Sequence, residues 1–349
     1  MKRNIRRASA LIIFVLAGCA GCPMDPFGNG DNRLVILSYN CQNLFDDVRQ
    51  GEEYPEYDPS SGEWTNETYL GKLAALAAAI QKAPEEPDIL LLQEVENSGT
   101  LERLSRDFLP LGGYDFYAAP RAHGAAVQTG LLSRIPVEKL LVHRPGGSES
   151  ERNILEIWLN PEGDEGGERI VLMNNHWKSR LGGAEATEPQ RLRSALLLRR
   201  RVEELNRDFT GINILFAGDF NEDPWETGRE YPTALGTKED FVAPPVIRVA
   251  GESDEDASGE ESAAAPDFYA FWSEIPEGGS YFYGGTWERI DHFFWNRSLA
   301  DGSGWDVAGC ILVDDPLLLN EYGTPLAYSG KTMRGYSDHL PLLLVLERQ

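Results

Sequence analysis

Short runs of apolar residues recur along the whole chain and predict buried β-strands. Each run has the length of a strand and is rich in Ile, Leu, Val or aromatic residues, which is typical of strands buried on both faces. The runs occupy residues 34–40, 88–92, 126–132, 153–159, 169–173, 212–217, 290–295 and 340–346. They indicate a core that contains one or more β-sheets.

Two longer segments, residues 67–82 and residues 186–207, place apolar side chains at helical spacing instead. In the first segment these side chains are Leu70, Leu73, Leu76 and Ile80, which is the pattern of a helix with one face buried. Strands mixed with a few helices up to the C-terminus favour a single α/β domain with sheets in the middle and helices outside.

Residues 249–266 interrupt this pattern with acidic residues, Ser, Gly and Ala. The segment has too few apolar side chains to form a core, so we expect an acidic insertion loop in contact with solvent. Calcium binding is the alternative, but the segment lacks the Asp-Gly loop spacing of calcium sites.

The start of the chain has the layout of a secretory signal. Four basic residues precede an apolar stretch at residues 10–17, which is too short to cross a hydrocarbon core of about 30 Å. The sequence Leu-Ala-Gly-Cys at residues 16–19 resembles the lipobox of bacterial lipoproteins. The resemblance implies that residues 1–18 are a signal peptide and that Cys19 carries a lipid. The alternative is an ordinary signal peptide followed by cysteine by coincidence.

Residues 19–32 then form the lipidated N-terminus and a linker rich in Pro, Gly, Asn and Asp, and the folded domain occupies residues 33–349. Because two or more acyl chains anchor a protein stably, we expect an extracytoplasmic protein tethered to a bacterial membrane, on the periplasmic face or at the cell surface. We expect a monomer with no protein partner.

The net charge of the chain is −24, and it becomes −28 when the four basic residues of the signal are removed. Such a surface repels polyanions unless divalent cations or a local basic patch intervene. Two cysteines, Cys41 and Cys310, lie within the domain, and their spacing leaves open whether they pair.

Polar residues with catalytic or metal-binding chemistry stand at the ends of the apolar runs. They are Asn40, Glu94, His176, Asp219, Asn221, Asp291, Asp338 and His339. Taken singly, each has a structural explanation as a helix cap, a turn or a solvated strand end. Neighbouring strands also bring their ends together, so we expect one acidic pocket at the edge of a sheet.

Carboxylate and amide oxygens suit a hard divalent cation such as Mg²⁺, Mn²⁺ or Ca²⁺. Zinc is disfavoured, because His176 and His339 are far apart and the chain has no HExxH or CxxC motif. A divalent cation, an imidazole and amide donors together are what hydrolysis of a phosphoester requires.

Six segments resemble, in order, the signature blocks of the endonuclease/exonuclease/phosphatase superfamily, which includes DNase I. They are LSYNCQNLF, LLQEVEN, NNHWKS, GDFNEDP, RIDHFFW and SDHLPLLL, within residues 33–348. Each block is weak alone, but six in order are specific. The resemblance implies a DNase I-like fold, a four-layer α/β sandwich in which two mixed β-sheets pack face to face with helices outside.

The resemblance also implies roles for residues at the matching positions. Glu94 would be the main ligand of Mg²⁺ (with Mn²⁺ or Ca²⁺ as alternatives), helped by Asn40 and Asp338. Asp219 would position or deprotonate the attacking water, and Asn221 would bind a phosphate oxygen.

The two histidines receive separate roles from the same resemblance. His339 would be the catalytic acid or base, with Asp291 holding its other ring nitrogen. His176 would contact the phosphate or assist the leaving group.

Three basic residues are candidates for contacts with substrate. Arg152 stands where nucleases of the superfamily often carry a phosphate-binding arginine, with a surface ion pair as the alternative. Lys178 and Arg180 closely follow His176, so we expect them at the rim of the pocket, binding phosphates that flank the scissile one.

The run Asn-His-Trp-Lys-Ser is similar to that of secreted or surface-attached bacterial nucleases of the superfamily. We therefore expect a metal-dependent phosphodiesterase, a nuclease acting on DNA or RNA. The alternatives are a phosphatase or a sphingomyelinase or phospholipase C-like enzyme acting on lipid head groups, and a non-catalytic surface lipoprotein with the same fold. All expected catalytic positions are filled, which argues against the last.

Overall fold

The computed structural model describes residues 32–122, 124–146, 151–163, 166–226, 229–237, 245–250, 267–275 and 278–349. The predicted signal peptide, the predicted lipidation site Cys19 and nearly all of the predicted acidic insertion loop lie outside these ranges. Within the described ranges, no helix has the length and the apolar character needed to cross a bilayer.

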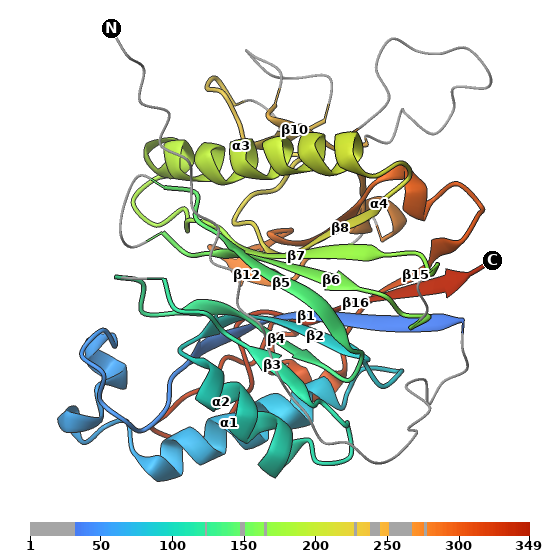
Figure 1. Cartoon of the computed structure of the whole chain (residues 1–349). Coiled ribbons are helices and arrows are strands. Elements are labelled where there is room, and N and C mark those ends of the chain that lie inside the picture. The colour runs from blue at the N-terminus through green and yellow to red at the C-terminus, as the bar shows by residue number, and fades with distance from the viewer. Residues whose placement is uncertain are drawn as a thin grey trace, which may run out of the picture.

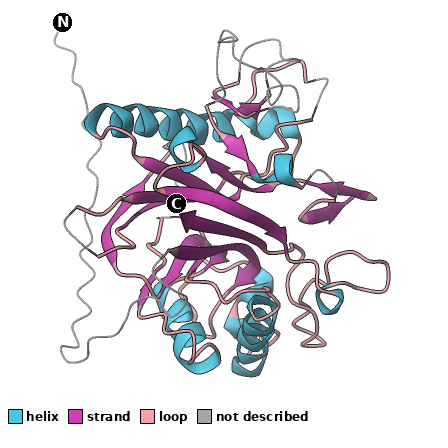
Figure 2. Cartoon of the chain, turned by 90° about the vertical axis from the view of Figure 1, so that its right-hand side faces the viewer, coloured by secondary structure: helices cyan, strands magenta, loops and turns pink. Residues whose placement is uncertain are grey.

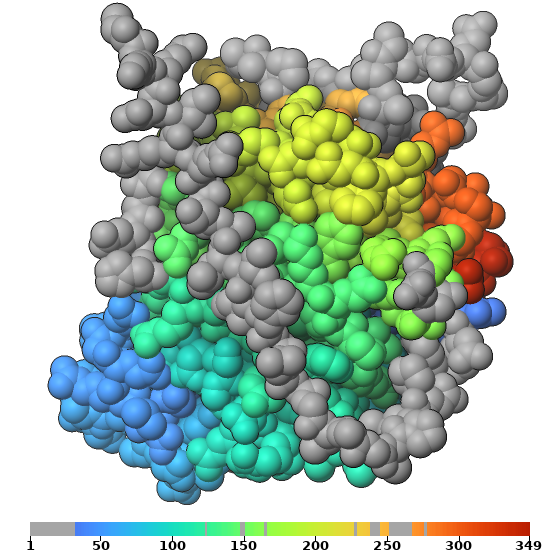
Figure 3. Space-filling view, viewed as in Figure 1, coloured from blue at the N-terminus to red at the C-terminus, as the bar shows by residue number. Residues whose placement is uncertain are grey.

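Two six-stranded mixed sheets lie face to face, and helices cover the outer face of each (Figures 1 and 2). The first sheet has the order β15-β16-β1-β2-β4-β3, and the second has the order β11-β14-β8-β7-β6-β5. Helices α1 and α2 cover the first sheet, and α3 covers the second (Figure 1). In the space-filling view, the yellow side chains of α3 lie directly above the green ones of the second sheet (Figure 3). The predicted four-layer fold is confirmed.

The strands of the first sheet are β1 (Arg33–Leu44), β2 (Ile89–Val95), β3 (Phe116–Ala118), β4 (Gln128–Ser133), β15 (Trp305–Leu312) and β16 (Leu342–Arg348). Those of the second sheet are β5 (Val137–His143), β6 (Ile154–Leu159), β7 (Ile170–His176), β8 (Asn213–Asp219), β11 (Tyr269–Ala270) and β14 (Asp291–Trp295). Two small two-stranded sheets pair β9 (Leu235–Gly236) with β10 (Ile247–Arg248), and β12 (Tyr281–Tyr283) with β13 (Thr286–Glu288).

The α-helices are α1 (Asn66–Ile80), α2 (Ser98–Arg103), α3 (Ala184–Asp208) and α4 (Phe271–Glu274). Short 3₁₀ turns are η1 (Pro55–Tyr57), η2 (Pro59–Ser61), η5 (Arg297–Leu299) and η6 (Pro316–Leu318), and a π-helical turn, η3 (Leu104–Phe108), follows α2. Both predicted helices are present as α1 and α3, and each predicted apolar run overlaps a strand of one of the two main sheets.

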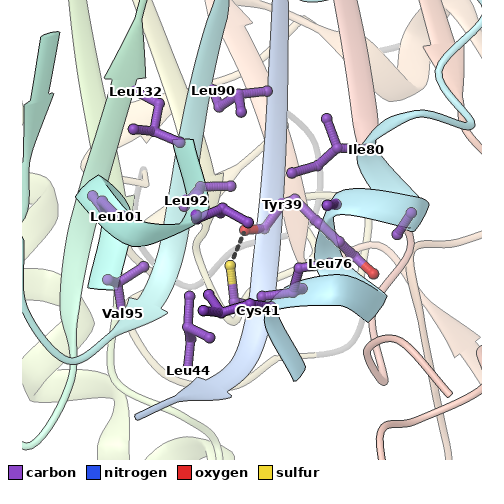
Figure 4. Close-up of a cluster of buried hydrophobic side chains, with 14 of the residues drawn as sticks. Tyr39, Cys41, Leu44, Leu76, Ile80, Leu90, Leu92, Val95, Leu101 and Leu132 are labelled. Carbon is purple, nitrogen blue, oxygen red and sulfur yellow. Dashed lines mark hydrogen bonds between the residues drawn. The ribbon is translucent and has the colours of Figure 1, made fainter. Parts of the chain in front are cut away.

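Strand alternation explains why the central strands are apolar almost without interruption. Successive side chains of a strand point to opposite faces. In β1, Val35 and Leu37 therefore face the core under α1 and α2, while Leu34 and Ile36 face the core between the sheets. Figure 4 shows the former core around Tyr39 and Cys41. A third core lies between the second sheet and α3.

Two longer strands, β5 and β15, were missed by the sequence analysis because they lie at the edges of the sheets. An edge strand keeps polar side chains in contact with solvent, so its apolar run is broken. Cys310 lies in β15 and Cys41 in β1, and both are free thiols, which answers the question of pairing left open by their spacing.

A buried group of charged residues fastens the loop after β8 to α3. Arg191 pairs with Glu188 at 2.6 Å and with Glu222 at 3.7 Å, and Arg229 pairs with Glu222 at 2.6 Å. Burial and the neighbouring carboxylate of Glu188 raise the pKa of Glu222 to about 8. Separating these residues would leave a buried charge without a partner, which is strongly unfavourable. The group therefore holds the backbone that directly follows Asp219 in place.

Register brings the polar strand ends to one edge of the molecule. In the second sheet, Asp219 of β8 lies between His176 of β7 and Asp291 of β14. In the first sheet, β1 runs parallel to β2, with Asn40 beside Gln93. The candidate residues of the two sheets meet at one end of the molecule, where Asn40 contacts Asp219.

We predict that Gly218→Ala destabilises the protein by about 2–3 kcal/mol. Gly218 has a φ of 125°, and a Cβ atom there would overlap the carbonyl of Asn175 on the neighbouring strand. Urea unfolding followed by tryptophan fluorescence would measure the loss. The control is Gly166→Ala, because a Cβ at Gly166 meets no atom within 4 Å; an equal loss in both variants would contradict the prediction.

Candidate active site

The candidate site lies where the ends of the two sheets meet. From the first sheet come Asn40, Glu94 and, just before β16, His339, and from the second sheet come His176, Asp219 and Asp291. Most of these side chains are buried, although carboxylates are rarely buried without partners. Their contacts account for this burial.

Asn40 connects the two sheets through its side-chain amide. Its Nδ2 donates to Oδ2 of Asp219 at 3.0 Å and lies 3.4 Å from Oε1 of Glu94. His176 completes the group, because its Nε2 lies 3.7 Å from the same oxygen of each carboxylate. Four predicted residues from four strands therefore meet within contact distance.

The backbone around this group adopts a conformation that is unusual for residues other than glycine. Asn43, Glu94 and Asn221 have φ angles of 58°, 61° and 52°. Such left-handed residues cost stability and tend to occur at functional sites. At Glu94 the turn is held by the backbone N–H of Asn43, which donates to Oε2 at 2.7 Å. In this conformation the Glu94 carboxylate lies beside Asn40 and His176.

The carboxyl group of Asp219 is poised to exchange a proton near neutral pH. Burial raises the pKa of Asp219 to about 7, with further contributions from the carboxylates of Asp291 and Glu94. The backbone N–H of Asn221 donates to its Oδ1 at 2.9 Å. A group with a pKa near the working pH is suited to general acid–base catalysis.

Asp291 and His339 form the contact that the sequence analysis predicted. Nδ1 of His339 lies 2.7 Å from Oδ2 of Asp291, which also accepts a hydrogen bond from Ser280 Oγ at 2.6 Å. Burial alone would lower the pKa of His339, but the Asp291 carboxylate outweighs it and raises the pKa to about 10. At neutral pH the ring is therefore a cation that donates hydrogen bonds.

His176 is the opposite case. Burial, followed by the positive charges of Arg152, His339 and Lys178, holds the pKa of His176 well below its usual range. Its Nδ1 is buried and has no hydrogen-bond partner among the residues that the structure describes. At neutral pH His176 is therefore a neutral imidazole.

The donors at the site fit a hard divalent cation. Glu94 and Asn40 lie together. The half-buried Asp338 is close to Glu94, because both carboxylates act on the hydroxyl group of Tyr57. Burial raises the pKa of Tyr57 to about 12, and the two carboxylates add to the rise. Ligand atoms of Asp219, Asp291 and His339 also lie within 4.8 Å of one another. Oxygen-rich groups of this kind suit Mg²⁺, Mn²⁺ or Ca²⁺. The division of ligands among these residues stays a prediction.

Two of the three predicted substrate-binding cations lie beside His176. Arg152 and Lys178 line a pocket of about 170 Å³ together with Tyr54, Glu151, His176, Trp177, Gln190 and Ser194. The Nη1 atom of Arg152 donates to the carbonyl of Trp177 at 3.0 Å. Burial, Arg152 and Arg191 lower the pKa of Lys178, as expected when cations are crowded together. The pocket is a local basic patch on an acidic protein.

The third cation, Arg180, already has carboxylate partners. Its guanidinium lies 2.6 Å from Glu226 and 3.9 Å from Glu288. These pairs balance its charge, so Arg180 is less available for a phosphate than Arg152 and Lys178. Its role in substrate binding stays a prediction, as do the catalytic roles of the other residues.

The sequence analysis missed three residues that support the site. Lys72 of α1 is fully buried, donates from Nζ to the carbonyl of Tyr336 at 2.8 Å and lies over the ring of Tyr328. A lysine inside the apolar face of a predicted helix was the signal that could have found it. Ser280 contacts Asp291, and Tyr281 stacks on His339; no sequence signal marks these contacts, because they depend on how a hairpin folds back.

The fold is shared with several solved structures. Truncated TDP2 of Caenorhabditis elegans has a TM-score of 0.52 and 16% identity, and the alignment covers 90% of this chain and 97% of that one. An endonuclease/exonuclease/phosphatase family protein of Bacteroides thetaiotaomicron has a TM-score of 0.52 and 15% identity, with 91% and 98% covered. A mannosyl-6-phosphatase of the same bacterium has a TM-score of 0.51 and 15% identity, with 90% and 99% covered. At these identities the likeness concerns the fold.

No curated protein matches the chain in sequence. The sequence profile of the Endonuclease/Exonuclease/phosphatase family, however, matches residues 35–240, which is more than half of the 349 residues. The profile covers the first four of the six segments that suggested this resemblance, and the structures share the fold that it implied. The chain therefore belongs to the endonuclease/exonuclease/phosphatase family of hydrolases.

Proposed function

We propose that this protein is a divalent-metal-dependent phosphodiesterase that cleaves nucleic acid outside the cytoplasm while anchored to a membrane through Cys19. The observation that carries the proposal is the buried group of Asp219, Asp291 and His339 beside His176, which itself lines the basic pocket of Arg152 and Lys178. The anchor rests on the lipobox-like segment of the sequence.

Each side chain has a task that follows from its protonation. Asp219, whose pKa is about 7, accepts the proton of the attacking water when it is ionised. The cationic ring of His339, oriented by Asp291, donates a hydrogen bond to the phosphoryl group as negative charge develops on it. Asn221 and the neutral His176 contact the remaining phosphate oxygens. A bound divalent cation, held by Glu94 with Asn40 and Asp338, would neutralise charge on the phosphoryl oxygens.

The basic pocket favours a polyanionic substrate. The chain carries a net charge of −24, so long-range electrostatics oppose nucleic acid, and local cations must offset this repulsion. Arg152 and Lys178 offer such cations beside His176, where the next phosphate of a strand would lie. A phosphatase acting on a sugar phosphate is the second candidate, because the mannosyl-6-phosphatase of Bacteroides thetaiotaomicron has the same fold.

One incubation series separates the candidate functions. Purified mature protein is mixed with plasmid DNA, an RNA oligonucleotide, a sugar 6-phosphate and sphingomyelin vesicles, with Mg²⁺ or with EDTA. We expect EDTA-sensitive cleavage of nucleic acid. Phosphate release from the sugar alone would favour the phosphatase, and phosphocholine release alone would favour a phospholipase. No EDTA-sensitive hydrolysis of any of these would refute the enzymatic proposal.

We predict that His339→Gln lowers kcat on the best substrate at least about 100-fold, because one preorganised donor at a developing charge contributes that much. His339 contacts Asp291 at 2.7 Å, so Asp291→Asn should cause a loss of similar size. Circular dichroism melts would establish that both variants are folded. Full activity in folded His339→Gln would exclude the assigned role.

We predict that Asp219→Asn changes the pH dependence of stability in EDTA. Folded Asp219 keeps its proton up to a pKa of about 7, whereas an unfolded aspartic acid releases it near a pKa of about 4. The unfolded state therefore binds fewer protons in this window, and the wild type loses stability as the pH rises through it. The variant has no such proton, so its stability relative to wild type should rise by on the order of 2 kcal/mol between about pH 5 and pH 8.

Urea titrations of both proteins at several pH values measure this difference. The control is the same substitution at the exposed Asp314, which should leave the difference from wild type constant across the range. If the stability difference between Asp219→Asn and wild type did not change with pH, the carboxyl group of Asp219 in the wild type would be ionised throughout the range.

We predict that Lys178→Met weakens binding of a single-stranded oligonucleotide and reduces the slope of log affinity against log salt by about 0.7, which is the loss of one phosphate contact. Fluorescence anisotropy in EDTA, in which no cleavage is expected, measures both at several salt concentrations. Arg200→Met is the control, because Arg200 is exposed on α3. Equal slopes for Lys178→Met and wild type would remove Lys178 from the substrate path.

A further inference from the structure

The hairpin formed by β12 and β13 lies against the candidate catalytic histidine. Its register pairs Tyr281 with Glu288, Phe282 with Trp287 and Tyr283 with Thr286. Gly284 and Gly285 form the tip, with φ angles of 60° and 93°, which a two-residue hairpin turn requires. The hairpin is therefore a well-defined element with two distinct faces.

The base of the hairpin is fastened to His339 by several contacts. The carbonyl of Ser280 accepts the backbone N–H of Leu340 at 2.7 Å, and Tyr281 forms a β-bridge with His339. The ring of Tyr281 stacks on the ring of His339, with centroids 4.6 Å apart and planes at 30°. The position of Tyr281 is thus fixed relative to the reacting group.

The two faces of the hairpin have different surroundings. Phe282 and Trp287 contact each other edge to face at 5.5 Å, and Trp287 packs against the core under α1 and α2. Because side chains alternate along a strand, Tyr281 and Tyr283 lie on the other face. The hairpin is thus packed through one face, and its packing does not require Tyr283.

The second face points toward the site. Glu288, opposite Tyr281, lies 3.9 Å from Arg180, which follows His176 in the chain. Tyr283 is 63% exposed, and its ring lies nearly parallel to that of Tyr281, at 10° with centroids 6.2 Å apart. The rings of His339, Tyr281 and Tyr283 therefore form a series from the buried site to solvent.

We propose that Tyr281 and Tyr283 form a stacking subsite for an unpaired nucleobase next to the scissile phosphate, so that the preferred substrate is single-stranded nucleic acid or an unpaired end. The inference rests on the proposed nuclease function and specifies its substrate class. A side chain can stack on the face of a nucleobase only when that base is not stacked within a duplex. An exposed ring that continues an ordered series of rings is suited to such a face, and aromatic stacking is a general means of holding single strands.

The test compares kcat/KM for a single-stranded oligonucleotide and for the same strand in a duplex. We expect the wild type to prefer the single strand. Tyr283→Ala should lower kcat/KM on the single strand about tenfold and on the duplex much less, and Tyr283→Phe, which keeps the ring, should restore it to within about twofold. Tyr117→Ala is the control, because Tyr117 is 36% exposed on the edge strand β3 of the first sheet.

A second arm replaces single bases of the oligonucleotide by an abasic sugar. At one position next to the cut, the abasic substrate should lose about the same factor as Tyr283→Ala, and the variant should lose nothing further on that substrate. Independent, multiplying losses at every position would overturn the stacking subsite, as would an unchanged kcat/KM of Tyr283→Ala on the single strand. If the wild type cleaves no nucleic acid at all, the proposed function fails; if it cleaves but Tyr283 is neutral, only this inference fails.

Discussion

The hydrogen bond from Asn40 to Asp219 joins the two sheets at the edge where the chemistry is expected. Each residue is carried on a central strand, so its position is fixed by the register of a whole sheet. Face-to-face packing of the sheets then decides whether the amide reaches the carboxylate. Glu94 and His176 are grouped around the same pair, so the acidic site exists only when both sheets have formed and packed together.

Burial gives this group its chemistry and also its cost. An acidic pocket in a protein of charge −24 is unfavourable for folding, because burial and mutual repulsion penalise the ionised carboxylates. The same effects raise the pKa of Asp219 to about 7, and Asp291 keeps His339 cationic by raising its pKa to about 10. One buried group thus contains a carboxyl group that titrates near neutral pH and a cationic imidazole that donates hydrogen bonds. Left-handed Glu94 and Asn221 add to the cost, as is common where binding geometry outweighs stability.

Support for the site comes mostly from residues outside the six segments that resemble the family's signature blocks. The Glu188–Arg191–Glu222–Arg229 group fixes the loop behind Asp219, and Lys72 fixes the segment before Asp338 and His339. The β12–β13 hairpin adds Ser280 under Asp291 and Tyr281 over His339.

The sequence by itself determined the layers of the fold and the location of the site. Apolar runs predicted the central strands because these are buried on both faces, and polar residues at their ends predicted the pocket because adjacent strands end together. The apolar pattern did not predict edge strands such as β5 and β15, because one side of each is in contact with solvent. Only the tertiary structure decided which cation is neutralised by carboxylates: Arg180 is paired with Glu226 and Glu288, while Arg152 and Lys178 line the pocket. Ion pairing and ring stacking join residues far apart in the chain, and their geometry depends on side-chain positions that no local pattern encodes.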